Sequence, residues 1–184
     1  MSKLVTFITA IFLLFLTIII SLSANANIQD IEVGFSPGNT ANHLVITAIK
    51  EAKHSIDIAA YSFTSKNIAL SLVDAQQHGI NVRIVADKKL NNGHYTALTY
   101  LAHHHILVKL NNKYAIMHNK FMIIDGHSVQ TGSFNYTQGA VSRNAENVIY
   151  LRNRLDITKK YIKEFNRLWN ESIDEHYIFT HIIK

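Results

Sequence analysis

The sequence predicts an α/β domain in which a mixed β-sheet is flanked by helices on both faces. Short apolar segments that suit strands alternate along the chain with amphipathic segments that suit helices. Two of the apolar segments are separated by Asp125-Gly126, a dipeptide typical of a β-hairpin turn. A hairpin makes neighbouring strands antiparallel, so the predicted sheet is mixed rather than purely parallel.

The first half of the chain contains three predicted strands, each followed by a predicted helix. In the first strand, Ile31, Val33 and Phe35 alternate with other residues before a Ser-Pro-Gly turn. The second helix is expected to stop at Gly79, because glycine commonly ends helices. In chain order, the predicted elements are strand 31–35, helix 41–53, strand 56–61, helix 67–78, strand 80–86 and helix 96–104.

The second half is richer in strands and ends in a long helix. A helix over 155–169 places Phe165 and Trp169 at helical spacing, which is typical of a face that packs onto a core. No internal repeat is visible, so the pattern favours one layered domain. The strands expected before this helix are 106–110, 121–124, 129–131 and 147–151.

Residues 1–26 have the features of a secretory signal peptide, which leaves 27–184 as the folded domain. Lys3 precedes an uncharged, mostly apolar run, and Ala24-Asn25-Ala26 then offers small residues to a signal peptidase. We therefore expect cleavage after Ala26, a periplasmic or secreted protein, and no integral membrane span in the mature chain. The alternative is an uncleaved anchor helix, because about 19 apolar residues nearly span a bilayer.

Composition excludes some classes of protein. Hydrophobic residues make up 48% of the chain and charged residues only 17%, which argues against disorder. The chain has no cysteine, so disulfides and cysteine-ligated zinc sites are excluded. A net charge of +5 predicts attraction to polyanions such as nucleic acid or to an anionic lipid surface, and charge alone does not choose between them.

The densest pattern of polar side chains lies in residues 118–146. The spacing H-x-K-x4-D-x6-G-S-x-N is formed by His118, Lys120, Asp125, Gly132, Ser133 and Asn135, and Asn144 and Glu146 follow it. Side chains two apart on a strand share a face, and the hairpin brings the histidine–lysine pair beside the serine–asparagine pair. All four groups can donate hydrogen bonds, which suits an oxyanion such as a phosphate diester.

The imidazole adds reactivity to this cluster. A neutral histidine with a pKa of about 6.5 can attack phosphorus or move a proton near neutral pH. We expect Glu146 to hold the second ring nitrogen of His118 in the required tautomer, as the third group of a catalytic triad does.

The six-position pattern resembles, without departure, the HKD motif of the phospholipase D superfamily. The mature chain is also similar to the small bacterial Nuc endonucleases of that superfamily, which implies the phospholipase D/nuclease fold. The stretches that carry this resemblance are Val33-Gly34-Phe35-Ser36-Pro37, Ala60-Tyr61-Ser62-Phe63-Thr64, Gly132-Ser133-Phe134-Asn135-Tyr136-Thr137 and Asn144-Ala145-Glu146-Asn147.

The resemblance implies a mechanism without metal or cofactor. In this superfamily one histidine attacks the phosphodiester and forms a covalent phosphohistidine, and a second protonates the leaving oxygen and then activates water. This chain has a single motif, since no other histidine is followed by a lysine two residues on. The resemblance therefore implies a homodimer in which His118 of one copy is the nucleophile and His118 of the other is the acid and base.

Each remaining motif position has an expected role by the same resemblance. Lys120 and Asn135 bind the phosphate, and Ser133 supports the phosphate or a neighbouring motif side chain. Asp125 and Gly132 are expected to be structural. Asn144 is a lesser candidate that is expected near the dimer interface.

No metal site is expected. The triplet at residues 103–105 has consecutive imidazoles that point in different directions, which is unsuited to one ion.

The function expected from these features is a metal-independent, non-specific endonuclease that hydrolyses DNA, with RNA as a further substrate. No base-reading module accompanies the motif, so binding through backbone charge would leave the bases unread. The alternative is a phospholipase D that degrades lipid, because its catalytic groups are the same. A second alternative is a non-catalytic phosphate-binding module.

Overall fold

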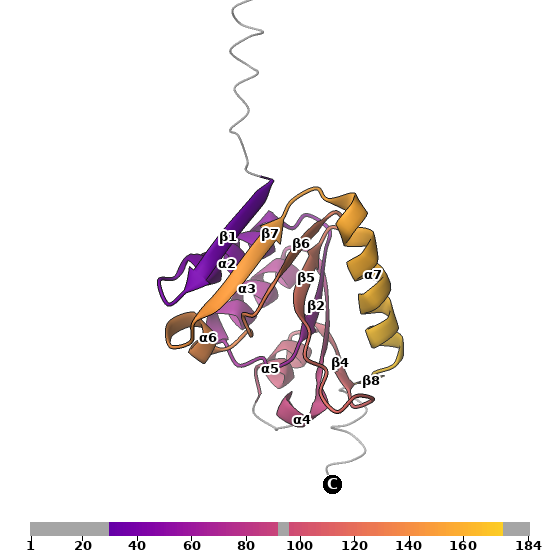
Figure 1. Cartoon of the computed structure of the whole chain (residues 1–184). Helices are drawn as coiled ribbons and strands as arrows, with labels where there is room; N and C mark the ends of the chain where they lie inside the picture. The colour runs from indigo at the N-terminus through magenta and orange to yellow at the C-terminus, as the bar shows by residue number, and fades with distance from the viewer. Residues whose placement is uncertain (1–29, 92–95, 175–184) are drawn as a thin grey trace, which may run out of the picture.

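Eight strands form one mixed sheet in the computed structural model, which describes residues 30–91 and 96–174 (Figure 1). Their order across the sheet is β1-β7-β6-β5-β2-β3-β4-β8. The strands are β1 (Ile31–Ser36), β2 (Ser55–Ala60), β3 (Asn81–Asp87), β4 (Leu107–Asn111), β5 (Lys120–Ile124), β6 (Ser128–Gly132), β7 (Glu146–Leu151) and β8 (Ile173–Asp174). The predicted signal peptide lies outside the described residues.

Strand directions confirm that the sheet is mixed. β2, β3 and β4 are parallel neighbours, as expected where helices connect successive strands. β5, β6 and β7 form an antiparallel meander, and β1 pairs antiparallel with β7 at the sheet edge. Because β5 and β7 run against β6, the start of β5, the end of β6 and the start of β7 meet at one end of the sheet.

Helices cover both faces of the sheet, which confirms the predicted fold class (Figure 1). The larger layer includes α2, α3 and α5, and α7 packs on the opposite face. The short α4, α6 and β8 were not predicted, because elements of two to five residues show no periodicity. The helices are α2 (Thr40–Glu51), α3 (Lys66–Gln77), α4 (Lys88–Asn91), α5 (Ala97–His103), α6 (Gln138–Ser142) and α7 (Leu155–Asn170).

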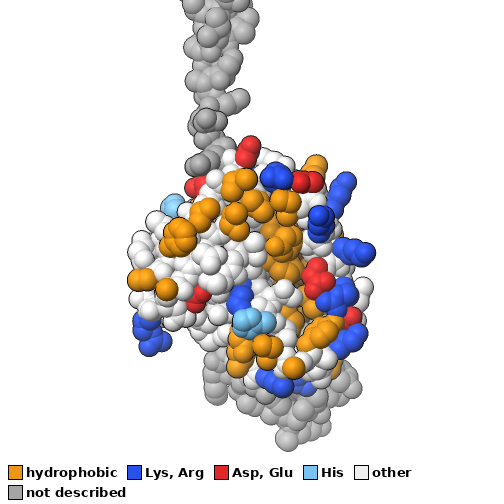
Figure 2. All heavy atoms as spheres, in the orientation of Figure 1, with side chains coloured by type: hydrophobic (Ala, Val, Ile, Leu, Met, Phe, Trp, Pro, Cys, Tyr) orange, Lys and Arg blue, Asp and Glu red, His pale blue; other side chains and the backbone are white. Residues whose placement is uncertain are grey.

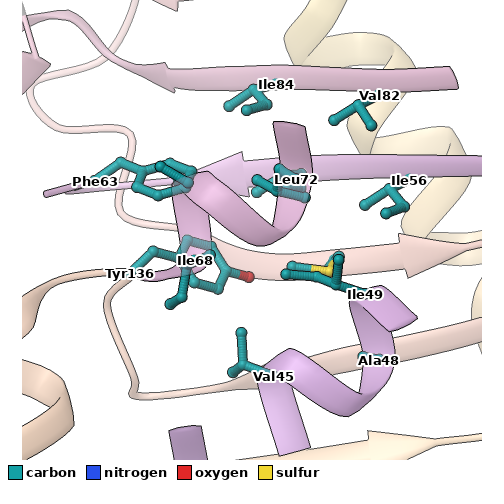
Figure 3. Packing of buried hydrophobic residues seen from close by; sticks show 14 of the residues in the cluster. Val45, Ala48, Ile49, Ile56, Phe63, Ile68, Leu72, Val82, Ile84 and Tyr136 are labelled. Atoms are coloured by element: carbon teal, nitrogen blue, oxygen red, sulfur yellow. The ribbon is translucent and has the colours of Figure 1, made fainter. Parts of the chain in front are cut away.

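Strand alternation divides the core into two clusters. On the α2–α3 side, Ile56, Leu72 and Ile84 are fully buried and pack together (Figure 3). On the α7 side, Phe121 and Phe165 anchor a smaller cluster. Burial of a large apolar side chain stabilises a fold by about 1.5–3 kcal/mol, so both layers contribute to holding the central strands in place.

α7 covers only part of its face of the sheet. It packs over β2 to β6, while β1 and β7 extend beyond it (Figure 1). The side chains of β1 that point to this face, Ile31, Val33 and Phe35, are therefore left exposed. Within residues 30–91 and 96–174, no helix has the length and apolar character needed to cross a bilayer.

Candidate active site

The five residues predicted to be catalytic or to bind substrate line one pocket, together with Gly132, at the end of the sheet where β5 begins and β6 ends. The pocket has a volume of about 580 Å³ and is open to solvent. The start of β5 supplies the histidine and lysine, the turn after β6 supplies the serine and asparagine, and β7 supplies the glutamate. These residues are His118, Lys120, Ser133, Asn135 and Glu146.

Lys120 is the most buried of these groups, with only 8% of its surface exposed. Its ammonium donates to the carbonyl oxygen of His118 at 2.8 Å, and Nζ lies 2.9 Å from the Nδ1 atom of the same residue. Burial lowers the pKa of Lys120, and the charge of Glu146 partly offsets that effect. An ammonium that has lost much of its water binds an incoming phosphate oxygen more strongly than an exposed one would.

Tyr61 forms one wall around these two side chains. It follows directly after β2, and its ring centroid lies 4.3 Å from that of His118 at a tilt of 59°. Nζ of Lys120 lies 5.0 Å from the same ring, within the range of a cation–π contact. Tyr61 thus restricts both the imidazole and the ammonium, and the motif pattern had not assigned it a role.

Two buried residues fix the backbone on either side of this contact. Asp87 ends β3, and its Oδ2 atom accepts a hydrogen bond from the amide of Met117, next to the histidine. Asn91 in α4 donates to the carbonyl of Tyr61 at 2.8 Å and accepts from the amide of Phe63 at 3.1 Å. Neither residue touches the pocket, and both are positioning residues that sequence reasoning missed.

Glu146 makes different contacts from those predicted. Its Oε2 atom accepts from the Ser133 hydroxyl at 2.6 Å, and its Oε1 atom accepts from the side-chain amide of Asn144 at 2.9 Å. Glu146 begins β7, which adjoins β6, so it meets the residue at the end of β6, whereas His118 lies one strand further away. The predicted contact with His118 is therefore wrong for the single chain, where Lys120 faces Nδ1 instead.

Asp125 lies at the opposite end of β5 from the pocket. Its carboxylate accepts hydrogen bonds from the backbone amides of Lys53, His54 and Ser55 at 2.7–2.8 Å. Burial acts to raise the pKa of Asp125, but the three amides outweigh it and the pKa is lowered. The residue thus ties the β5–β6 hairpin to the start of β2.

Gly132 lets two strands approach closely beside the pocket. A Cβ atom at this position would lie 2.2 Å from the carbonyl oxygen of Asn147, and φ is +152°. Any side chain here would push β7 from β6 and disturb Ser133. Asn135 lines the pocket, and its Oδ1 atom has no hydrogen-bond partner among the described residues.

The pocket is chemically suited to an anion. Lysine, serine, asparagine and histidine converge in it, and the single carboxylate is occupied by two neighbours. In the part of the chain that the structure describes, no three histidine, aspartate or glutamate side chains gather as a metal site would require.

The sequence matches the family model described as "Cardiolipin synthase, PLD-like domain" over residues 45–169, which include the whole pocket motif. The chain belongs to the phospholipase D superfamily. This confirms the resemblance that the HKD pattern suggested. Among solved structures, it is similar to Nuc from Salmonella typhimurium, a phospholipase D family member, with a TM-score of 0.75 and 35% identity. That likeness covers 78% of this chain and 96% of Nuc.

Several curated relatives of this superfamily member are named as enzymes that act on phospholipids. It is 33% identical to a phospholipase D of Rickettsia prowazekii, over 74% of this chain and 66% of the relative. It is 28% identical to a mitochondrial cardiolipin hydrolase of Xenopus tropicalis, over 73% of this chain and 64% of the relative. The chain thus spans slightly less than two thirds of the length of these relatives. Superfamily membership places the chain among proteins with a phospholipase D-like domain.

Proposed function

We propose that this protein is a metal-independent phosphodiesterase, an endonuclease whose active site is shared by two copies of the chain. The observation that supports it is the pocket composition: one exposed imidazole beside a desolvated ammonium, with hydroxyl and amide donors around them. Such a set binds a phosphodiester, but one histidine cannot be both nucleophile and leaving-group acid in a single step. A second copy would supply the missing imidazole.

The chemistry balances with two histidines. Nε2 of His118 in one copy attacks phosphorus as the bond from phosphorus to the leaving oxygen breaks, and His118 of the second copy protonates that oxygen. The second histidine then takes a proton from water as the water attacks phosphorus and breaks the N–P bond. Both rings return to their starting states, while Lys120 and Asn135 hold the non-bridging oxygens.

The contact between Lys120 and His118 describes the pocket before substrate binds. A Nδ1 atom that accepts from the Lys120 ammonium leaves the proton of a neutral imidazole on Nε2. In the attacking copy Nε2 needs a lone pair, so the ring proton has to lie on Nδ1. In the copy that protonates the leaving oxygen, the ring is an imidazolium with a proton on each nitrogen. Lys120 therefore has to release Nδ1 in both copies, and a bound phosphate oxygen competes for its ammonium.

Several features favour nucleic acid as the substrate. The chain carries a net charge of +5, and the pocket is shallow enough to leave His118 exposed to a passing backbone. The resemblance to Nuc endonucleases extends along almost the whole of Nuc. Binding through phosphates alone predicts hydrolysis with little sequence preference.

A phospholipid is the second candidate substrate. Ile116 lies two residues before the histidine and is 49% exposed, so the pocket has an apolar neighbour that an acyl chain or bilayer surface would contact. The lipid names of the curated relatives support the same candidate. The reacting group is a phosphodiester in both cases.

One set of assays tests these proposals. Purified protein is incubated with plasmid DNA in EDTA, beside His118→Ala and beside His103→Ala, which removes an exposed imidazole at the end of α5 as a matched control. Nicking by the wild type and His103→Ala, but not by His118→Ala, supports the nuclease. Release of head groups from phosphatidylcholine or cardiolipin vesicles without nicking would replace it with the lipase. Inactivity of a folded protein on both substrates would leave a phosphate-binding module.

A further inference from the structure

The pocket around His118 has a second side that is aromatic rather than rich in hydrogen-bond donors. Phe121 follows the pocket lysine on β5, and Thr131 lies opposite it on β6, so both side chains share the face of the sheet on which α7 packs. Tyr161 of α7 completes this side of the pocket. The volume of about 580 Å³ lies in the range of pockets that hold a small organic ligand, so a phosphate group alone would fill only part of it.

Tyr161 is the ring on this side that a ligand can reach. Its side chain is half-buried, and its ring meets that of Phe121 edge-on, with centroids 4.9 Å apart and planes at 73°. Phe121 itself is only 2% exposed, so it supports the tyrosine without presenting a face of its own to the pocket. Contact with the core thus restricts the orientation in which Tyr161 meets a ligand.

The shape of this side of the pocket favours a flat ligand group. A phosphodiester carries a substituent on each side of phosphorus, and one of them would lie beside Tyr161 when the phosphate contacts Lys120. One accessible ring face suits a nucleobase, because proteins bind the bases of single strands by stacking them on aromatic side chains. A quaternary ammonium such as choline is instead typically enclosed by a cage of aromatic rings.

The charge of α7 supports the same ligand. Both carboxylates of the helix are in ion pairs with arginines. The exposed lysines of the helix are Lys159, Lys160 and Lys163. Figure 2 shows lysine and arginine side chains gathered on the side of the molecule where α7 lies. A polyanion whose reacting phosphate lies in the pocket would therefore pass a helix that attracts its neighbouring phosphates.

We infer that Tyr161 is the surface on which a nucleobase next to the scissile phosphate stacks. The inference rests on the proposed function and adds a contact with the base to binding through backbone charge. Every base has a π face, so stacking is compatible with hydrolysis that has little sequence preference. The contact would distinguish a strand that carries bases from one that carries phosphates alone.

Competition for plasmid nicking measures this contact. The competitors are oligothymidylate and a strand of equal length and charge in which each base is replaced by hydrogen. The wild type is expected to bind oligothymidylate at least about tenfold more tightly than the abasic strand, since stacking of even one base is worth about that factor. Because both strands compete for the same folded protein, the ratio of their inhibition constants does not depend on how much of a variant is folded.

Three variants locate the contact. Tyr161→Leu keeps an apolar side chain against Phe121 but removes the flat ring, and it should lower the ratio about tenfold through weaker binding of oligothymidylate alone. Tyr161→Phe keeps the ring and should retain the wild-type ratio. Tyr100→Leu, which removes a 40% exposed tyrosine from α5 as a matched control, should also retain it.

The outcomes separate this inference from the proposed function. If Tyr161→Leu keeps the wild-type ratio, or weakens the binding of both strands equally, the stacking surface is overturned, while plasmid nicking by the wild type leaves the nuclease standing. A wild type that nicks no plasmid but releases choline from phosphatidylcholine vesicles would overturn both.

Discussion

The two ends of β5 carry residues of the same motif in opposite situations. At its start, the Lys120 ammonium contacts the carbonyl and ring nitrogen of His118 and the aromatic ring of Tyr61. Just past its end, the Asp125 carboxylate accepts three backbone hydrogen bonds. At the start of β5, the charged ammonium lacks an anionic partner among the described residues, which a bound phosphate would supply. Past the end of β5, the charged carboxylate already has its hydrogen-bond donors.

The pKa shifts at the two ends have the same sign and opposite meanings. Burial lowers the pKa of Lys120, so the fold disfavours its charged form. Amide donors lower the pKa of Asp125 against the effect of burial, so the fold favours its charged form. A group held against its preferred charge state is typical of a functional site, whereas a satisfied charge stabilises the scaffold. Substitutions at four residues test this contrast, in order of their expected effect on turnover.

His118→Ala is expected to have the largest effect. Loss of the attacking or protonating ring should lower kcat by at least about 10⁴-fold, as found when a group that acts within a catalytic unit is removed. The exposed ring contributes little to the core, so the melting temperature should hardly change. Single-turnover kinetics on a short phosphodiester measure the loss, and residual activity above a tenth of wild type would contradict the assigned role.

Lys120→Met should come next. It keeps the length and apolar stem of the side chain and removes the ammonium, which should lower kcat about 10²–10³-fold, as loss of one charge-stabilising donor does. Stability should be maintained or increased, because the buried cation is no longer desolvated. Urea unfolding measured beside the kinetics separates the two effects, and a strongly destabilised variant would argue for a structural lysine.

Tyr61 provides a smaller and more selective change. Tyr61→Ala removes the wall against the His118 ring and should lower kcat about tenfold with little change in KM, since misplacement of a reacting group by a fraction of an ångström is costly. Tyr61→Phe keeps the ring and should retain nearly full activity. If both variants lose activity equally, the contribution of Tyr61 to catalysis comes from its hydroxyl and not from the face of its ring.

Asp125→Ala should leave turnover of the folded protein almost unchanged. Its cost should appear in the free energy of unfolding, as a loss of about 2 kcal/mol or more, because three amides lose a charged acceptor. The wild-type contribution should be complete above the ordinary pKa of 3.8 and disappear as pH falls through the lowered value. Urea titrations at pH 7 and pH 3 would show the difference between wild type and variant shrink in acid.

Most of the fold was predictable because its elements are long enough to show periodicity. The strand predicted at 121–124 is β5, and the helix predicted at 155–169 is α7, each within one residue at either end. The turn at Asp125-Gly126 adopts the positive φ values that such a hairpin needs. α4 was missed, although it supplies Asn91, because four residues have no detectable pattern.

The site was predictable only where its members are close in sequence. Hairpin geometry was sufficient to group His118 and Lys120 with Ser133, and the structure brings them into one pocket. The neighbour of Glu146 depended on strand order, which spacing does not reveal. Tyr61 and Asp87 lie at the ends of other strands. Their contacts with residues 117 and 118 depend on the conformation of loops, which shows no periodicity in the sequence.

The pairing of β1 with β7 determines when the sheet can be completed during synthesis. Ile31 pairs with Leu151 and Ser36 with Glu146, so β1 is synthesised more than 100 residues before the strand that it pairs with. Pairing over such sequence distances slows folding and exposes apolar segments in the meantime. A nascent chain that stops short of residue 146 therefore has an open edge and an incomplete pocket, because Glu146 both pairs with β1 and lines the pocket.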